Sequence, residues 1–179
     1  MLSKMAEDWE SEVYSEGNTV FFFCEVSDEN VRELCLILKR VSMTNEVIKL
    51  CIRSDGGDVY AGFAAMDFIR SLTAKGITIE TIAYGFCASA ATFLLLAGSK
   101  RLMGENAYVL IHQMSTEIWG TYGDLRNEMR ENKKLMKHFR RVYSSKTDIP
   151  EEILDKLMTK DVLLSAEKCI KYRIVDELI

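Results

Sequence analysis

The sequence predicts a single α/β domain built on a largely parallel β-sheet, and three observations support this prediction. Apolar strand-like segments alternate with helix-like segments along most of the chain, as in folds whose parallel strands are joined by crossover helices. The chain has 179 residues, 48% hydrophobic and 28% charged, which is the composition of an ordinary globular protein. This length suits one domain with a packed core.

Each element is predicted from its own pattern. Residues 1–18 are polar and acidic and include the turn formers Gly17 and Asn18, so they predict a flexible N-terminal segment ahead of a single domain at 19–179. Residues 19–26 are aromatic and β-branched and predict the first strand. Further strands are predicted at 47–52, 77–84, 107–111 and 174–179, and helices at 31–41, 60–72, from about 89, 122–145, 150–158 and from 165.

The helix predicted at 122–145 is long for a domain of this size. One of its faces carries apolar residues at helical spacing, and the other is densely charged. The pattern predicts a helix that projects from the globule and buries its stripe against another subunit. A helix buried in the core of the same domain is the alternative.

Charge and cysteine usage exclude several classes of function. The net charge of -4, without a basic block, argues against nucleic acid or a membrane surface as a partner. The five cysteines are an odd number and lack metal-ligand spacing, so we expect buried thiols and no metal site. No export signal or bilayer-spanning apolar run is recognisable, and we expect a cytoplasmic location.

The first segment with chemical potential is Ser54-Asp55-Gly56-Gly57, which follows a predicted strand. Paired glycines permit positive φ angles and close backbone approach. Amides in such a turn can face a developing oxyanion or a peptide backbone. On its own, a glycine pair between strand and helix is more often only a turn.

The second segment contains Ser89, where a strand ends and an apolar helix begins. Unpaired amides and the helix dipole favour anionic character there, which suits a nucleophile. The alternative is a serine that only caps the helix.

The third segment is an apolar strand that ends before His112, one of only two histidines. An ordinary imidazole pKa of about 6.5 suits a group that accepts the serine proton and returns it to a leaving amine. A structural histidine is the alternative, and His138 lies in a charged helical stretch typical of a surface. Asp161, just before an apolar run, could orient the imidazole, although other acidic residues compete for that role.

Together these segments resemble the proteolytic subunit of the ATP-dependent Clp protease, the ClpP family of serine peptidases. The resemblance covers about residues 19–179. Residues 54–57 are similar to the family's Ser-Pro-Gly-Gly turn, and residues 85–89, continued by FLLLAG at 93–98, are similar to its Gly-x-Ala-Ala-Ser nucleophile segment. Residues 111–113 match its Ile-His-Gln segment, and residues 161–166 resemble its Asp-x-x-Leu-Ser-Ala segment. Residues 174–176 match its closing Ile-Val-Asp.

The resemblance implies Ser89 as nucleophile, His112 as general base and Asp161 as its orienting partner. It implies an oxyanion hole formed by the amides of Gly57 and Ala90, and substrate binding by Gly56 and Gly57. The implied fold is a crotonase-like stack of ββα units with a protruding handle, which the helix at 122–145 would provide. The implied assembly is a homo-oligomer of heptameric rings that pair through their handles. Its chamber would receive unfolded polypeptide from a ring ATPase that uses the ATP, so this chain would bind no cofactor.

Several residues depart from the family pattern. Asp55 replaces the family's proline, and Ala90 replaces its usual methionine. Lys160 stands where an arginine commonly helps to pair the rings, and lysine lacks the planar bidentate fork. Lys49 and Cys51 replace aromatic residues of the ATPase docking pocket. Three other hypotheses therefore stay open: a catalytically silent ring subunit, a phage capsid-maturation protease on the same fold, and a crotonase-type acyl-CoA enzyme.

Overall fold

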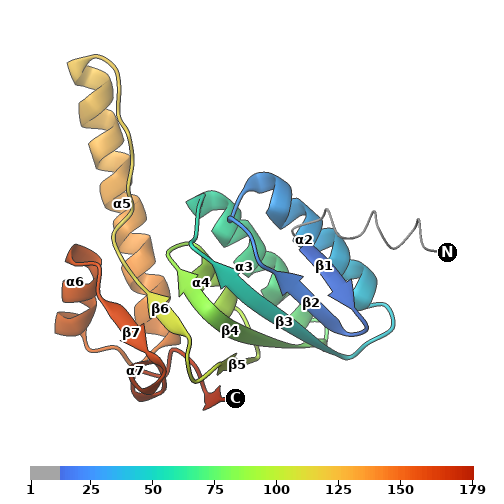
Figure 1. Ribbon diagram of the computed structural model, residues 1–179. Helices are drawn as coiled ribbons and strands as arrows, with labels where there is room; N and C mark the ends of the chain where they lie inside the picture. Colours follow the sequence, from blue (N-terminus) through green and yellow to red (C-terminus); the bar gives the residue numbers. More distant parts are fainter. Residues whose placement is uncertain (1–12) are drawn as a thin grey trace.

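The computed structural model describes residues 13–179, and its centre is one eight-stranded sheet (Figure 1). The strand order is β1-β2-β3-β4-β5-β8, and β6 pairs with β4 and carries β7 at its other edge. All pairs are parallel except β1–β2 and β6–β7, which confirms the predicted parallel α/β fold. The strands are β1 Val13–Glu16, β2 Thr19–Phe22, β3 Val47–Ser54, β4 Thr78–Ala88, β5 Lys100–Met103, β6 Tyr108–Leu110, β7 Leu163–Ser165 and β8 Glu177–Leu178.

Within these residues, six helices connect and cover the strands. Helices α2, α3 and α4 lie on one face of the sheet (Figure 1), and their first two members begin at side-chain caps from Ser27 and Asp58. No helix in this part of the chain is long and apolar enough to cross a membrane. The helices are α2 Asp28–Val41, α3 Val59–Thr73, α4 Ala91–Leu96, α5 Tyr122–Lys146, α6 Glu151–Thr159 and α7 Ala166–Lys171.

The main core fills the space between the sheet and these helices. Strand alternation places a second, smaller cluster on the opposite sheet face, formed by Cys51, Ile82 and Leu102 with Phe21 against them. The five cysteines are all free; four are buried, and Cys35 is half-buried. They behave as the buried thiols that the sequence predicts.

The first strand begins earlier than the sequence suggests. Of the expected flexible segment 1–18, residues 1–12 lie outside the described residues, but Val13–Glu16 form β1 and pair antiparallel with β2. Gly17 makes the tight turn with φ 59°, and Val13 is buried opposite Phe22. The next strand is shorter than predicted because β2 ends at Phe22, after which Val26 alone bridges to Gly57.

Helix α5 projects from the globule as a handle (Figure 1). Its buried residues, Phe139, Val142 and Tyr143, all belong to its last turns, where it joins the core. The projecting helix is therefore confirmed, and the core-helix alternative holds only for its base.

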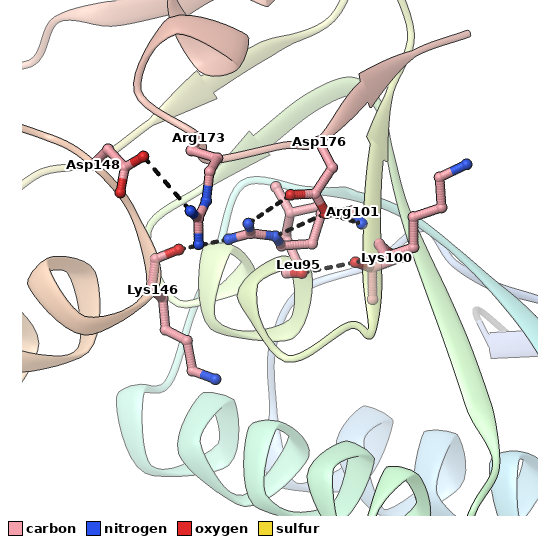
Figure 2. A network of polar contacts seen from close by, with 8 residues as sticks. Leu95, Lys100, Arg101, Lys146, Asp148, Arg173 and Asp176 are labelled. Carbon is pink, nitrogen blue, oxygen red and sulfur yellow. Dashed lines mark hydrogen bonds and ion pairs between the residues drawn. The ribbon is translucent and has the colours of Figure 1, made fainter.

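Arg101 fixes the base of the handle (Figure 2). Its guanidinium donates to the Lys146 carbonyl at 2.6 Å and to both carboxylate oxygens of Asp176, at 2.7 and 3.3 Å. This buried side chain on β5 thus joins the end of α5 to the C-terminal segment. A bidentate arginine–carboxylate pair adds geometric specificity as well as energy.

Candidate active site

Ser89 lies in the tight turn between β4 and α4. Its φ of 53° is a left-handed value that few non-glycine residues adopt. Its N–H donates to the Leu110 carbonyl at 2.9 Å, which holds the turn against β6. The N-cap of α4 is Ala90, without a side-chain cap, so the interpretation of Ser89 as only a helix cap is wrong. Strained backbone of this kind clusters at functional sites.

His112 lies just after β6 and Asp161 just before β7, and these strands run antiparallel with Leu110 opposite Leu163. Two residues beyond Leu110 and two before Leu163, the same register brings the histidine opposite the aspartate. The His112 Nδ1 and the Asp161 Oδ1 are 4.0 Å apart, with side-chain exposures of 22% and 79%. The structure therefore brings these two predicted residues together just beyond hydrogen-bonding distance.

Ser89 and His112 follow the ends of neighbouring strands. β4 and β6 are parallel neighbours with Ala88 opposite Leu110, so both residues leave the sheet at the same edge. Within residues 13–179 the serine hydroxyl makes no hydrogen bond to the imidazole. Hydrogen bonds between catalytic groups are often long in structures without substrate.

The Gly56-Gly57 turn packs directly against the serine turn. Both glycines have positive φ angles, 99° and 143°. A Cβ atom on Gly56 would lie 2.6 Å from the Ser89 Cβ and 3.2 Å from the Ala90 nitrogen, so only glycine fits this contact. A Cβ on Gly57 would collide with the Val26 carbonyl.

Two backbone hydrogen bonds hold this turn in place: Val26 N–H to the Gly56 carbonyl at 2.8 Å, and Asp58 N–H to the Val26 carbonyl at 2.7 Å. The Ser54 hydroxyl also accepts from the Gly56 N–H at 3.1 Å. In the described part of the chain, the N–H groups of Gly57 and Ala90 have no acceptor. These two amides are therefore available to an external oxygen.

A pocket of about 550 Å³ opens beside the glycine turn. Aromatic rings of Phe23 and Phe86 line it together with the charged side chains of Glu25, Arg53 and Asp55. Sequence analysis missed these lining residues, apart from Asp55, because no sequence pattern at the strand ends indicates a pocket. Among residues 13–179, no cluster of three His, Cys, Asp or Glu side chains could hold a metal ion.

Acyl transfer by serine requires a hydroxyl, a base, a group that orients the base, and donors for an oxyanion. One edge of this sheet supplies candidates for each from distant parts of the sequence: Ser89, His112, Asp161 and the paired amides. A hydrolase of the serine peptidase class needs this set of groups.

Comparison with known proteins identifies the family. The Clp protease family model matches residues 4–179. The chain is 34% identical over 146 residues to the ATP-dependent Clp protease proteolytic subunit of Deinococcus radiodurans, covering 80% of this chain and 70% of that protein. It is 32% identical over 156 residues to proteolytic subunit 2 of Treponema denticola, covering 86% and 76%.

Among solved structures, a point mutant of ClpP1 from Listeria monocytogenes superposes with a TM-score of 0.81 at 25% identity, covering 100% of this chain and 96% of that one. This match confirms the predicted ClpP-type fold. The chain belongs to the Clp protease family and is a serine endopeptidase subunit.

Proposed function

We propose that this subunit cleaves peptide bonds through an acyl-enzyme at Ser89. His112 takes the hydroxyl proton as Ser89 Oγ bonds to the scissile carbonyl carbon, and it then gives that proton to the leaving amine. Water, deprotonated by the same imidazole, releases the acyl group. The observation that supports this proposal is the strand order: β6, which precedes His112, pairs with β4, which precedes Ser89, and with β7, which follows Asp161.

Asp161 orients the imidazole in this proposal and stabilises its protonated form. The 4.0 Å separation from His112 must shorten by about 1 Å to make that hydrogen bond. The carboxylate is free to approach, because its side chain is 79% exposed and lies in the loop between α6 and β7.

The N–H groups of Gly57 and Ala90 would bind the oxyanion of the tetrahedral intermediate. Support comes from their unpaired state in the described residues and from the contact between the two turns that carry them. The carbonyls of Gly56 and Gly57 would also accept hydrogen bonds from an extended substrate such as unfolded polypeptide, because the Gly56 N–H is already bonded to Ser54. Removing one oxyanion donor typically costs about 10²- to 10³-fold in kcat.

The assembly is proposed to be a heptameric homo-oligomer whose rings pair through α5 and receive substrate from a ring ATPase. The relatives' names, ATP-dependent Clp protease proteolytic subunit, support an ATPase partner. Large apolar side chains exposed before and along α5 support pairing by the handle: Trp119 at 99%, Tyr122 at 79% and Met129 at 68%. This chain would bind neither cofactor nor metal, and it would act in the cytoplasm.

The test is covalent labelling by a fluorophosphonate, which reacts with an activated serine. We expect the wild-type protein to gain one adduct at Ser89, and Ser89→Ala to gain none. Ser71→Ala is the matched control, because the Ser71 hydroxyl is exposed and bonds only to the carbonyl of Phe68 on its own helix. A folded wild-type oligomer that resists the probe would contradict the proposal and favour the silent ring subunit.

A further inference from the structure

A buried hydrogen-bond chain links the base of the handle to the serine turn. The Thr92 Oγ1 lies 2.7 Å from the Tyr143 hydroxyl and 2.6 Å from the Ser89 carbonyl oxygen. Both partner side chains are shut off from solvent, with relative exposures of 0% for Thr92 and 1% for Tyr143. Buried polar pairs of this kind are costly unless every group is satisfied.

The direction of this chain follows from counting protons. A threonine hydroxyl has one hydrogen, and the Ser89 carbonyl can only accept. Thr92 therefore donates to Ser89, and Tyr143 donates to Thr92. Burial raises the pKa of the Tyr143 phenol, so the hydroxyl stays protonated and can donate this hydrogen bond.

The Ser89 carbonyl receives a second hydrogen bond from the same residue, the Thr92 N–H at 3.0 Å. Two donors thus fix the direction of this C=O. A peptide unit is planar and trans, so the C=O of Ser89 and the N–H of Ala90 point in opposite directions within one plane. Whatever fixes the carbonyl also fixes the Ala90 N–H.

We propose that Tyr143 and Thr92 are positioning residues, which hold the Ser89–Ala90 peptide so that the Ala90 N–H faces the oxyanion. This inference rests on the proposed function, because it assigns Ala90 to the oxyanion hole. It extends that function to the last turns of α5, where packing of Tyr143 on Phe93 at 5.8 Å between ring centroids holds the phenol.

Gly56 completes the clamp from the other side. Its backbone packs against the Ser89 Cβ and the Ala90 nitrogen, whereas Thr92 holds the Ser89 carbonyl from within α4. The Ser89–Ala90 peptide is thus confined between the glycine turn and the hydrogen bonds from Thr92 and Tyr143. Loss of the hydroxyl contacts would let it rotate and misdirect the amide.

The test compares Thr92→Val and Tyr143→Phe, which remove only the hydroxyls, with Thr92→Ser, which retains one. Thr81→Val is the matched control: it removes a buried hydroxyl that donates at 2.7 Å to the carbonyl of Leu95, which lies in α4 away from the serine turn. Peptide hydrolysis by the intact oligomer is measured, with kcat normalised to the sites titrated by fluorophosphonate.

We expect kcat to fall roughly 10- to 100-fold in Thr92→Val, less than for outright loss of an oxyanion donor. Tyr143→Phe should lose roughly 3- to 10-fold, because the bond from Thr92 to Ser89 survives. Both variants should leave KM unchanged and should bind a peptide boronate, which mimics the tetrahedral oxyanion, more weakly by the same factor. Thr92→Ser should remain within about twofold of wild type.

The inference is overturned if Thr92→Val and Tyr143→Phe lose no more kcat per titrated site than Thr81→Val, or if their losses lie in KM alone. If Thr92→Val does not fold, the contrast between Tyr143→Phe and Thr81→Val decides. A wild-type protein that the fluorophosphonate does not label overturns the proposed function, and this inference with it. A labelled wild type with unchanged variants overturns the inference only.

Discussion

Replacement of Gly56 by alanine is the sharpest single perturbation of the serine turn. The new methyl group would lie 2.6 Å from the Ser89 Cβ and 2.9 Å from the Ala88 carbonyl oxygen, which is closer than non-bonded atoms approach in a packed protein. The Ala88 carbonyl belongs to the end of β4 and cannot move without disturbing the sheet. The serine turn must therefore shift away from the glycine turn.

Two energetic costs add at this position. The backbone φ of 99° opposes any L side chain, at about 1–2 kcal/mol. Crowding against Ser89 and Ala88 adds about 1–3 kcal/mol for an overpacked site. We therefore expect unfolding free energy to fall by about 2–5 kcal/mol. Displacement of the nucleophile by about 1 Å would lower kcat/KM by roughly 100-fold in the molecules that stay folded.

Gly76 offers a control for the cost of the positive φ angle alone. Its φ of 91° is close to that of Gly56, but a Cβ atom there would meet nothing within 4 Å. Gly76→Ala should therefore lose about 1–2 kcal/mol and keep full activity. Denaturant unfolding and peptide hydrolysis per titrated serine separate the two effects. Equal stability and equal activity in the two variants would refute the proposed contact between the glycine and serine turns.

Three further outcomes follow from the structure. Asp161→Asn should lower kcat roughly 10²- to 10⁴-fold. The control Asp148→Asn removes an exposed carboxylate 3.7 Å from Arg173 and should leave kcat unchanged. Equal rates in the two variants would remove Asp161 from the mechanism. Burial opposes ionisation of Asp176, but hydrogen bonds from Arg101 outweigh it and lower the pKa. The stability advantage of wild type over Asp176→Asn should thus be full above about pH 4 and shrink below it in urea titrations; a gap independent of pH would contradict this. Burial raises the pKa of the Cys87 thiol, so iodoacetamide at about pH 8 should modify it only after unfolding, and rapid alkylation of the native protein would contradict the buried placement.

Much of the fold could be predicted because most helices and strands carry a clear periodicity. Helix α2 and strand β3 lie within a few residues of their predicted bounds, since their apolar residues recur at three- and four-residue steps or in one continuous run. Strands β5 and β7 escaped prediction because neither is a run of β-branched or aromatic residues: β5 reads Lys-Arg-Leu-Met and β7 reads Leu-Leu-Ser. β5 also contains Arg101, whose charge suggests a surface until its partners from the ends of α5 and the chain are known.

The candidate site was predictable only in part. Ser89, His112 and Asp161 were identified by motif, but their placement depends on the pairing of β6 with both β4 and β7, which no local pattern contains. The hydrogen bond between Thr92 and Tyr143 was equally hidden. Each residue fits an apolar helical stripe, and they are 51 positions apart, so neither one reveals the other's hydroxyl.

Three separate elements meet at the Ser89–Ala90 peptide, and each acts on a different group. β6 accepts the serine N–H through Leu110, the glycine turn after β3 presses on the Cβ, and Thr92 holds the carbonyl. A positive φ at a non-glycine residue costs about 1–3 kcal/mol and persists only where its surroundings over-determine it. No single one of these contacts is strong enough to hold the positive φ at Ser89 by itself. The strain at Ser89 therefore requires that sheet, glycine turn and handle base be correctly packed together, which makes the serine turn sensitive to all three.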